Sequence, residues 1–112
     1  MSEASSPLQD LSRQLEQFAR ERDWGRFHSP KNLASALIVE AAELLEHFQW
    51  LTEEQSRQLD ADQRQAVAAE MADVLLYLLQ MGNELGIDVA EAAKAKMLVN
   101  AERFPISPKQ KE

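Results

Sequence analysis

Two pairs of carboxylates lie inside apolar segments of the 112-residue chain, where acidic side chains are uncommon. Glu40 and Glu43 interrupt the segment SALIVEAAELL, and Glu70 and Asp73 stand at the head of the most apolar segment. Each pair has i, i+3 spacing, so on a helix its two side chains share one face with Cβ atoms about 5–6 Å apart. Each pair could therefore supply two oxygen ligands to one cation.

Bringing these four acids together is costly unless a cation binds between them. Two like charges about 4 Å apart repel by on the order of 4 kcal/mol at an effective dielectric constant near 20. No Lys or Arg occurs between Lys31 and Arg57 to offset this repulsion. An all-carboxylate ligand set selects Mg²⁺, Mn²⁺ or Ca²⁺ over Zn²⁺. The pattern predicts a divalent-metal site, and the alternative is two ordinary exposed helix faces.

The composition restricts the class of protein. The 19 acidic and 12 basic residues give a net charge of −7, which argues against a nucleic acid polymer as partner. The absence of cysteine excludes disulfides and thiolate metal sites and fits a reducing compartment. The opening MSEASSPLQDL lacks a signal-peptide pattern, and the apolar stretch from Met71 to Met81 is shorter than a membrane span of about 20 residues. We expect a cytoplasmic protein without a membrane partner.

Helical spacing and end signals predict an all-α chain. Ser29 before Pro30 is a start signal, Thr52 and Asp88 each open a capping-box pattern, and Gly86 is the expected end of a long helix. In order, the expected helices run from Leu8 to a loop at residues 22–25, from Pro30 to about Trp50, from Thr52 to Leu59, from Asp60 or Asp62 to Leu85, and from Asp88 to about Arg103.

These helices predict a four-helix bundle with a short extra helix, as a single domain over residues 1–112 with a core at about 8–105 and a frayed tail at 106–112. Between Met71 and Met81 the long helix is apolar on nearly all sides, so it must be buried all round. A small chain cannot easily enclose such a helix, and we expect a homo-oligomer. The alternative is that this helix is the centre of one bundle.

The order of these motifs resembles a known family. Glu40-x-x-Glu43 and Glu70-x-x-Asp73, separated by 26 residues, match the ExxE…ExxD signature of the all-α MazG-like nucleoside triphosphate pyrophosphatases. The chain is most similar to the dCTP pyrophosphatase branch, and the resemblance spans about residues 8–105. The supporting segments are WGRFHSPKNLASAL (24–37), EHFQW (46–50), DVLLYLL (73–79), LGIDVAEA (85–92) and KMLVNAERFP (96–105).

The resemblance implies an activity and an assembly. It implies a Mg²⁺-dependent enzyme, with Mn²⁺ as a substitute, that cleaves a nucleoside triphosphate between its α- and β-phosphates to a monophosphate and pyrophosphate. The substrate implied is dCTP or a modified dCTP, and the role implied is housecleaning of the nucleotide pool. The assembly implied is a homotetramer, a dimer of dimers, with active sites at subunit contacts.

The resemblance also implies a role for each candidate site residue. The Mg²⁺ ligands would be Glu40, Glu43, Glu70 and Asp73, with Glu43 or Glu40 also acting in catalysis by steering the attacking water. Helical spacing, rather than the resemblance, places Glu46 on the same face three residues after Glu43, where it is either a further ligand candidate or a solvent-exposed acid. The triphosphate would be bound by Lys96 and Asn100, which match a KxxxN motif, and by Lys31. The base and sugar would be surrounded by Trp24, His28, Trp50 and Tyr77.

Two other interpretations stay open at this point. The first keeps the fold and the metal but changes the substrate to dUTP or another noncanonical nucleotide. The second is a non-enzymatic helical oligomer that binds a cation and hydrolyses nothing. Lys96 and Asn100 weigh against the second interpretation, because a simple metal-binding protein needs neither.

Overall fold

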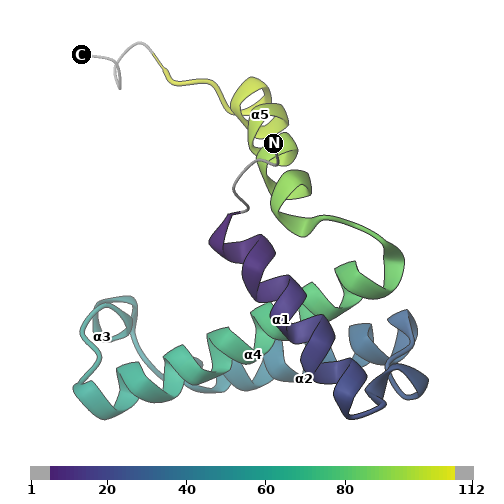
Figure 1. Cartoon of the computed structure of the whole chain (residues 1–112). Coiled ribbons are helices and arrows are strands. Elements are labelled where there is room, and N and C mark those ends of the chain that lie inside the picture. The colour runs from purple at the N-terminus through teal and green to yellow at the C-terminus, as the bar shows by residue number, and fades with distance from the viewer. Residues whose placement is uncertain (1–5, 108–112) are drawn as a thin grey trace.

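The computed structural model describes residues 6–107, and every regular element in this range is helical (Figure 1). In chain order the elements are α1 (Pro7–Glu21), the 3₁₀ helix η1 (Trp24–Arg26), α2 (Pro30–Glu46), α3 (Glu53–Ser56), α4 (Ala61–Leu85) and α5 (Val89–Arg103). The all-α prediction is confirmed. None of these helices is both long and apolar enough to cross a bilayer. Of the predicted frayed tail, residues 108–112 lie outside the described range.

The start and end signals produce the expected caps. The Ser29 hydroxyl accepts a hydrogen bond from the Asn32 backbone N–H at 3.1 Å, and Pro30 follows as the first residue of α2. Asp60, rather than Asp62, caps α4 in a full capping box with Gln63. Gly86 ends α4 with φ of 68°, in the left-handed region that glycine adopts without steric cost.

Several helix boundaries differ from the sequence predictions. Helix α2 ends at Glu46 rather than near Trp50, because the chain tightens into i→i−3 hydrogen bonds at residues 47 and 48. Helix α3 ends at Ser56 rather than Leu59, and residues 24–26 form a 3₁₀ turn where a loop was predicted. At α5, Asp88 caps the backbone of Glu91 as predicted, but the Glu91 carboxylate lies 3.4 Å from Lys94 Nζ, so the box is only half formed.

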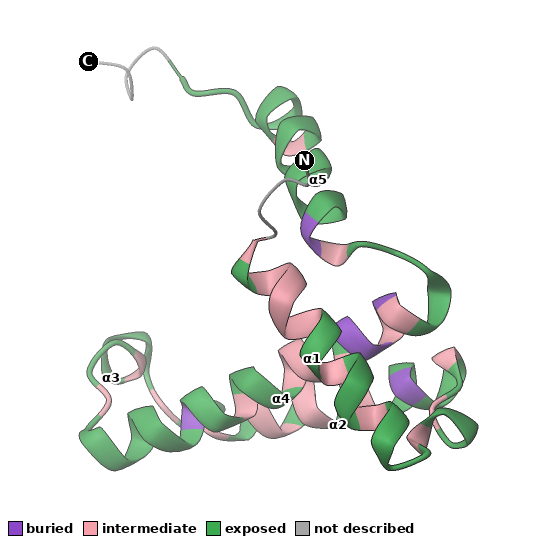
Figure 2. Ribbon diagram, in the orientation of Figure 1, coloured by how far each residue is buried: buried purple, intermediate pink, exposed green. Residues whose placement is uncertain are grey.

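Helices α2 and α4 pack against each other over a long contact, and α1 lies across α4 (Figure 1). Leu33 and Leu79 are almost fully buried, yet few other described residues are (Figure 2). Helix α5 leaves the end of α4 and projects away from the α2–α4 pair. The radius of gyration is 17.6 Å, against about 13 Å for a compact chain of this length. One copy of the chain is therefore an open arrangement of helices.

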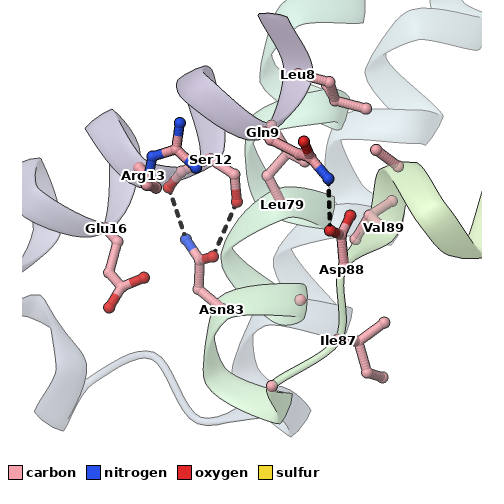
Figure 3. Close-up of a pocket in the computed structure, with 13 residues that line it drawn as sticks. Leu8, Gln9, Ser12, Arg13, Glu16, Leu79, Asn83, Ile87, Asp88 and Val89 are labelled. Carbon is pink, nitrogen blue, oxygen red and sulfur yellow. Dashed lines mark hydrogen bonds between the residues drawn. The ribbon is translucent and has the colours of Figure 1, made fainter. Parts of the chain in front are cut away.

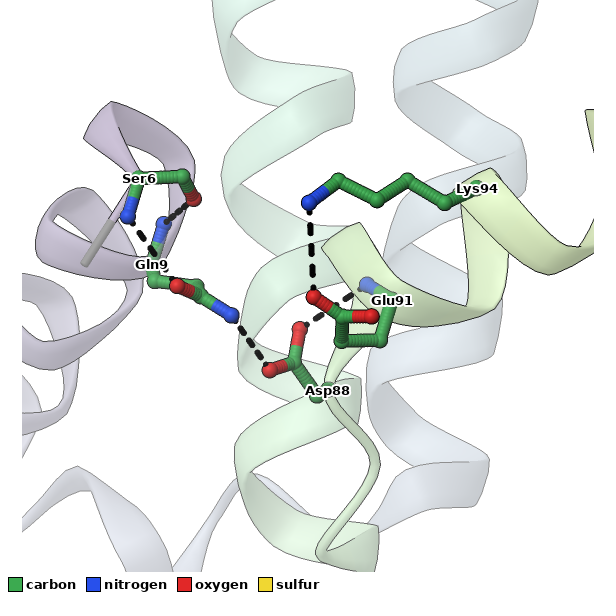
Figure 4. A network of polar contacts seen from close by, with 5 residues as sticks. All are labelled: Ser6, Gln9, Asp88, Glu91 and Lys94. Carbon is green, nitrogen blue, oxygen red and sulfur yellow. Dashed lines mark hydrogen bonds and ion pairs between the residues drawn. The ribbon is translucent and has the colours of Figure 1, made fainter. Parts of the chain in front are cut away.

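Polar contacts from α1 hold the end of α4 and the start of α5. The Ser12 hydroxyl donates to Asn83 Oδ1 at 2.9 Å, and Asn83 Nδ2 donates to the Ser12 carbonyl at 3.0 Å (Figure 3). Gln9 Nε2 donates to Asp88 Oδ2 at 2.7 Å while Asp88 also accepts from the Glu91 backbone (Figure 4). These two hydrogen bonds, that from Glu91 first, lower the pKa of Asp88. The first turns of α1 thus help set the direction in which α5 leaves the bundle.

The turn after α4 requires glycine at position 82. A Cβ there would lie 2.7 Å from both the Ile87 carbonyl oxygen and Val89 Cγ2, and the Ile87 N–H donates to the Gly82 carbonyl at 2.8 Å. We expect Gly82→Ala to lower the free energy of unfolding by about 1–2 kcal/mol, because the clash exceeds the gain in helix propensity. Urea unfolding at fixed protein concentration measures this, with Gly25→Ala as the control, since a Cβ there meets nothing within 4 Å. Equal stability of both variants would contradict the prediction.

Candidate functional site

The pairing of α2 with α4 brings three of the four predicted metal ligands together. Glu40 and Glu43 come from the middle of α2 and Glu70 from α4. One carboxylate oxygen from each lies within 4.8 Å of the other two, and all three residues are partly buried. This three-carboxylate group is formed by two segments that are far apart in the sequence.

The charges in the three-carboxylate group are not compensated by the protein. Glu70 Oε2 is buried without a hydrogen-bond partner, and within residues 6–107 no basic side chain forms an ion pair with any of the three acids. Burial, and then the nearby Glu70 carboxylate, raise the pKa of Glu40. The pKa of Glu43 is raised mainly by the adjacent Glu40 carboxyl, through hydrogen bonding and then charge repulsion. The group therefore favours either proton uptake or a bound cation.

A divalent cation fits the three-carboxylate group by chemistry and by size. The donors are all hard oxygens, which Mg²⁺ and Ca²⁺ prefer. Oxygens on opposite sides of such an ion are about 4–5 Å apart, which is comparable with the 4.8 Å limit of the group. A bound ion would also coordinate Glu70 Oε2, which has no hydrogen-bond partner in the protein. Glu40, Glu43 and Glu70 are thus the residues that could hold a metal.

Asp73 and Glu46, the other acids named from the sequence, lie beside the three-carboxylate group rather than within it. Asp73 is exposed, but it is close enough for its charge to contribute to the raised pKa of Glu40. Glu46 is also exposed, and its charge contributes to the raised pKa of Glu43. Asp73 faces a neighbouring pocket, so it stands between the acids and that pocket.

An aromatic pocket of about 350 Å³ adjoins the acids. Its lining residues come from α1, η1, the loop after η1 and α4, and they are Leu15, Phe18, Trp24, His28, Asp73, Leu76, Tyr77 and Gln80. The Trp24 and His28 rings have centroids 5.4 Å apart, and Phe18 meets Trp24 edge-on at 5.3 Å. Trp24, His28 and Tyr77, which were named from the sequence as base and sugar residues, are thus brought together next to Asp73.

The remaining predicted site residues are not brought to the acids by one copy of the chain. Trp50 lies after the end of α2, is 87% exposed and does not line the aromatic pocket. Lys96 and Asn100 lie on α5, which projects away from the α2–α4 pair (Figure 1). Lys31 is exposed in the first turn of α2. The predicted phosphate-binding residues therefore stand apart from the predicted metal ligands within a protomer.

The sequence predictions missed Gln80 as a lining residue of the pocket. Asp73, Tyr77 and Gln80 follow one another at i, i+4 and i+7, so they share one face of α4. Gln80 is also the lone amide in the apolar stretch from Met71 to Met81. This spacing and this polarity can be read from the sequence. They identify Gln80 as a pocket residue only once the aromatic residues of α1 and η1 are known to lie against this face of α4.

Comparison with known proteins gives consistent matches. The model of the MazG-like family matches residues 36–112. The chain is 40% identical to mouse dCTP pyrophosphatase 1 over 101 residues, and 39% identical to the human protein of that name over 100 residues. Each alignment covers 88% of this chain and 59% of the relative, so the chain spans well under two thirds of those relatives' length.

A solved structure resembles the whole fold. The crystal structure of a pyrophosphatase from Archaeoglobus fulgidus superposes with a TM-score of 0.83 and 34% sequence identity. The superposition covers 95% of this chain and 99% of the archaeal chain. The open arrangement of helices is therefore shared with a protein of nearly the same length.

The raised pKa values of Glu40 and Glu43 predict an unusual pH dependence of the metal-free protein. Both pKa values lie above the ordinary 4.5. The two groups therefore contribute stability below about pH 4.5, and this contribution is lost as the pH rises through their folded-state values. In the presence of EDTA we expect Glu40→Gln to have a higher melting temperature than the unsubstituted protein near pH 7, with the difference vanishing toward pH 4.5.

Differential scanning fluorimetry across this pH range measures the effect. Addition of Mg²⁺ near pH 7 is the internal control, and it should stabilise the unsubstituted protein more than Glu40→Gln, because the variant has lost a ligand. A melting-temperature difference that is independent of pH, or an equal response to Mg²⁺, would contradict this assignment of the three-carboxylate group.

Proposed function

The chain belongs to the MazG-like family, and on this basis we propose that it is a Mg²⁺-dependent nucleoside triphosphate pyrophosphatase. It would cleave dCTP or a modified dCTP between the α- and β-phosphates, releasing the monophosphate and pyrophosphate. The observation that carries the proposal is the three-carboxylate group of Glu40, Glu43 and Glu70 next to an aromatic pocket. Support for the base comes from the similarity to dCTP pyrophosphatase 1 of mouse and human.

The acids would act mainly by positioning. When bound, Mg²⁺ would neutralise charge on the phosphates and help to orient a water molecule. Glu40, Glu43 and Glu70 would hold the ion in a partly buried place, where electrostatic interactions are stronger than in bulk water. Asp73, which lines the aromatic pocket, would complete the ligand set. Glu43, or Glu40 in its place, would accept a hydrogen bond from the attacking water and so align it with the bond between the α- and β-phosphates.

The aromatic pocket would bind the nucleoside part. Trp24 and His28 present adjacent rings, and Tyr77 lies one turn from Asp73 on α4. Base stacking on such rings contributes about 1–3 kcal/mol each and tolerates changes in the base. Stacking alone would therefore give affinity without strong selectivity, and a hydrogen-bonding group is needed to read the base edge.

We propose further that the active enzyme is a homo-oligomer, a tetramer built from dimers, in which α5 completes a four-helix arrangement with another copy. Met97, Leu98 and Phe104 on or just after α5 are each about 70% exposed, and Met71 on α4 is 57% exposed. Leaving such apolar area in water is unfavourable by about 25 cal/mol for each Å². Assembly would cover these side chains.

Assembly would also explain the separation of the predicted phosphate-binding residues from the acids. Lys96 and Asn100 lie four residues apart on one face of α5, so both could approach the same triphosphate. Since α5 projects away from its own α2–α4 pair, these residues would serve the acids of another subunit (Figure 1). Trp50, which is largely exposed in one copy, would likewise meet its ligand at a subunit contact.

Turnover of a nucleotide panel tests the proposed activity. We expect Mg²⁺-dependent hydrolysis of dCTP or a modified dCTP, with the products identified as monophosphate and pyrophosphate rather than diphosphate and phosphate. If the protein prefers dUTP or another noncanonical nucleotide, the proposed reaction is retained and the proposed substrate is wrong. If the metal-loaded protein hydrolyses no nucleotide, the proposed activity is wrong, and the interpretation as a non-enzymatic oligomer that binds a cation replaces it.

Substitution of single acids tests the proposed metal ligands. We expect Glu43→Gln and Asp73→Asn each to lower kcat/KM by about 100-fold or more, since loss of even an outer partner of a metal site costs about 10–100-fold. Circular dichroism should show unchanged helicity. Glu54→Gln, at an exposed acid of α3, is the matched control and should keep full activity. Full turnover in both Glu43→Gln and Asp73→Asn would remove the metal assignment.

A charge placed on α5 tests the proposed assembly. Leu98 is 72% exposed in one copy, so Leu98→Glu should cost little in an isolated protomer but should disfavour an interface that buries this residue. Size-exclusion chromatography with light scattering should show a tetramer for the unsubstituted protein and smaller species for Leu98→Glu. Glu102→Gln on the same helix is the control and should leave the mass of the assembly unchanged. A monomeric unsubstituted protein would refute the assembly.

A further inference from the structure

Gln80 is a buried polar residue whose amide the protein does not use. It is 7% exposed, and among the described residues it is the one buried residue that is polar. No hydrogen bond links its side chain to any described residue, yet neither amide atom is sealed from solvent. The side chain instead lines two neighbouring pockets, the aromatic pocket of about 350 Å³ and a second of about 240 Å³.

The place of this amide favours a hydrogen bond to a group that enters the pockets. Because the amide makes no hydrogen bond within the described protein, its partner is water or a ligand in the pockets, whereas an apolar side chain of similar size would need no partner. Leu76 and Leu79 beside it on α4 are apolar. Gln80 lines the same pocket as the rings of Trp24 and His28, so the edge of a planar ligand stacked on those rings would come within reach of the amide.

The position of Gln80 along α4 matches the order of groups in a nucleotide. Asp73, Tyr77 and Gln80 lie on one face, and seven residues of helix rise by about 10.5 Å. Asp73 adjoins the three-carboxylate group, where the phosphates would be, and Tyr77 lies between. Among the α4 residues that line the aromatic pocket, Gln80 is therefore the farthest from the acids along the helix, where the edge of a base would lie.

We propose that Gln80 is a specificity-determining residue that hydrogen-bonds the edge of a pyrimidine base, an inference that rests on the proposed function. Its Oε1 would accept from the 4-amino group of cytosine, and its Nε2 would donate to the ring N3. Since no described residue fixes the orientation of the amide, a rotation by half a turn would present the reversed pattern to uracil. Gln80 thus hydrogen-bonds the group at position 4 and the ring N3, and it can do so with either cytosine or uracil.

Pairing a residue substitution with a substrate substitution tests this inference. The substrates are dCTP and the matching triphosphate of 2-pyrimidinone, which lacks the 4-amino group, and the proteins are the unsubstituted chain and Gln80→Met. We expect the unsubstituted enzyme to prefer dCTP by about 10-fold in kcat/KM and Gln80→Met to lose that preference, because the two changes remove the same hydrogen bond. The loss should lie mainly in KM for dCTP.

The controls separate this inference from the proposed function. Gln65→Met, at an exposed position of α4, should leave both substrates unaffected. Gln80→Asn keeps an amide but withdraws it by one methylene group, so it should lose the same preference even if Gln80→Met fails to fold. Retention of the dCTP preference in the folded Gln80 variants would overturn the role of Gln80 and leave the pyrophosphatase activity intact. No hydrolysis of any nucleotide by the unsubstituted chain would overturn both.

Discussion

Repulsion among Glu40, Glu43 and Glu70 is the constraint around which the α2–α4 pair is organised. Packing of the apolar faces of these helices draws three carboxylates to within 4.8 Å and leaves Glu70 Oε2 without a hydrogen-bond partner. The raised pKa values of Glu40 and Glu43 are the direct sign of this conflict between packing and charge. A bound divalent cation removes the conflict, so hydrophobic contact along the helices and metal binding would stabilise the same arrangement.

Helix α4 connects the metal ligands to the aromatic pocket. Glu70 contributes to the three-carboxylate group, while Asp73, Tyr77 and Gln80 line the pocket along one face of the same helix. Because an α-helix is stiff and rises by about 1.5 Å per residue, the spacing between the two places hardly varies. The other rings that line the pocket come from α1, from η1 and from the loop after η1. Only this part of the lining therefore depends on a loop. Such a site suits chemistry that proceeds by positioning.

The open shape of one copy is consistent with a site completed by assembly. Hydrogen bonds from Gln9 and Ser12 of α1 hold Asp88 at the start of α5 and Asn83 near the end of α4, so the departure of α5 is a defined feature of the fold (Figures 3 and 4). Close contact at Gly82 supports the same turn. The similar archaeal pyrophosphatase shares this shape over nearly its whole length. A projecting helix with exposed apolar side chains is then available to another subunit.

Most of the helices and the core of the candidate metal site could be predicted from the sequence, because they depend on local rules. Ser29, Asp60 and Gly86 act through hydrogen bonds or backbone angles within a few residues of themselves, and i, i+3 spacing alone places Glu40 beside Glu43. The helix ends near Trp50 and Leu59 were wrong because helical and 3₁₀ turns differ little in free energy, so the surrounding chain decides between them.

What only the tertiary structure decided is which distant residues meet. The sequence indicated that Glu70 should join Glu40 and Glu43, but the contact depends on the register of α4 against α2. The place of Gln80 in the aromatic pocket follows from how α1 crosses α4, and the separation of Lys96 from the acids follows from the direction in which α5 leaves the end of α4. Local propensities carry no information on such crossings, since these are set by side-chain packing over the whole length of each helix.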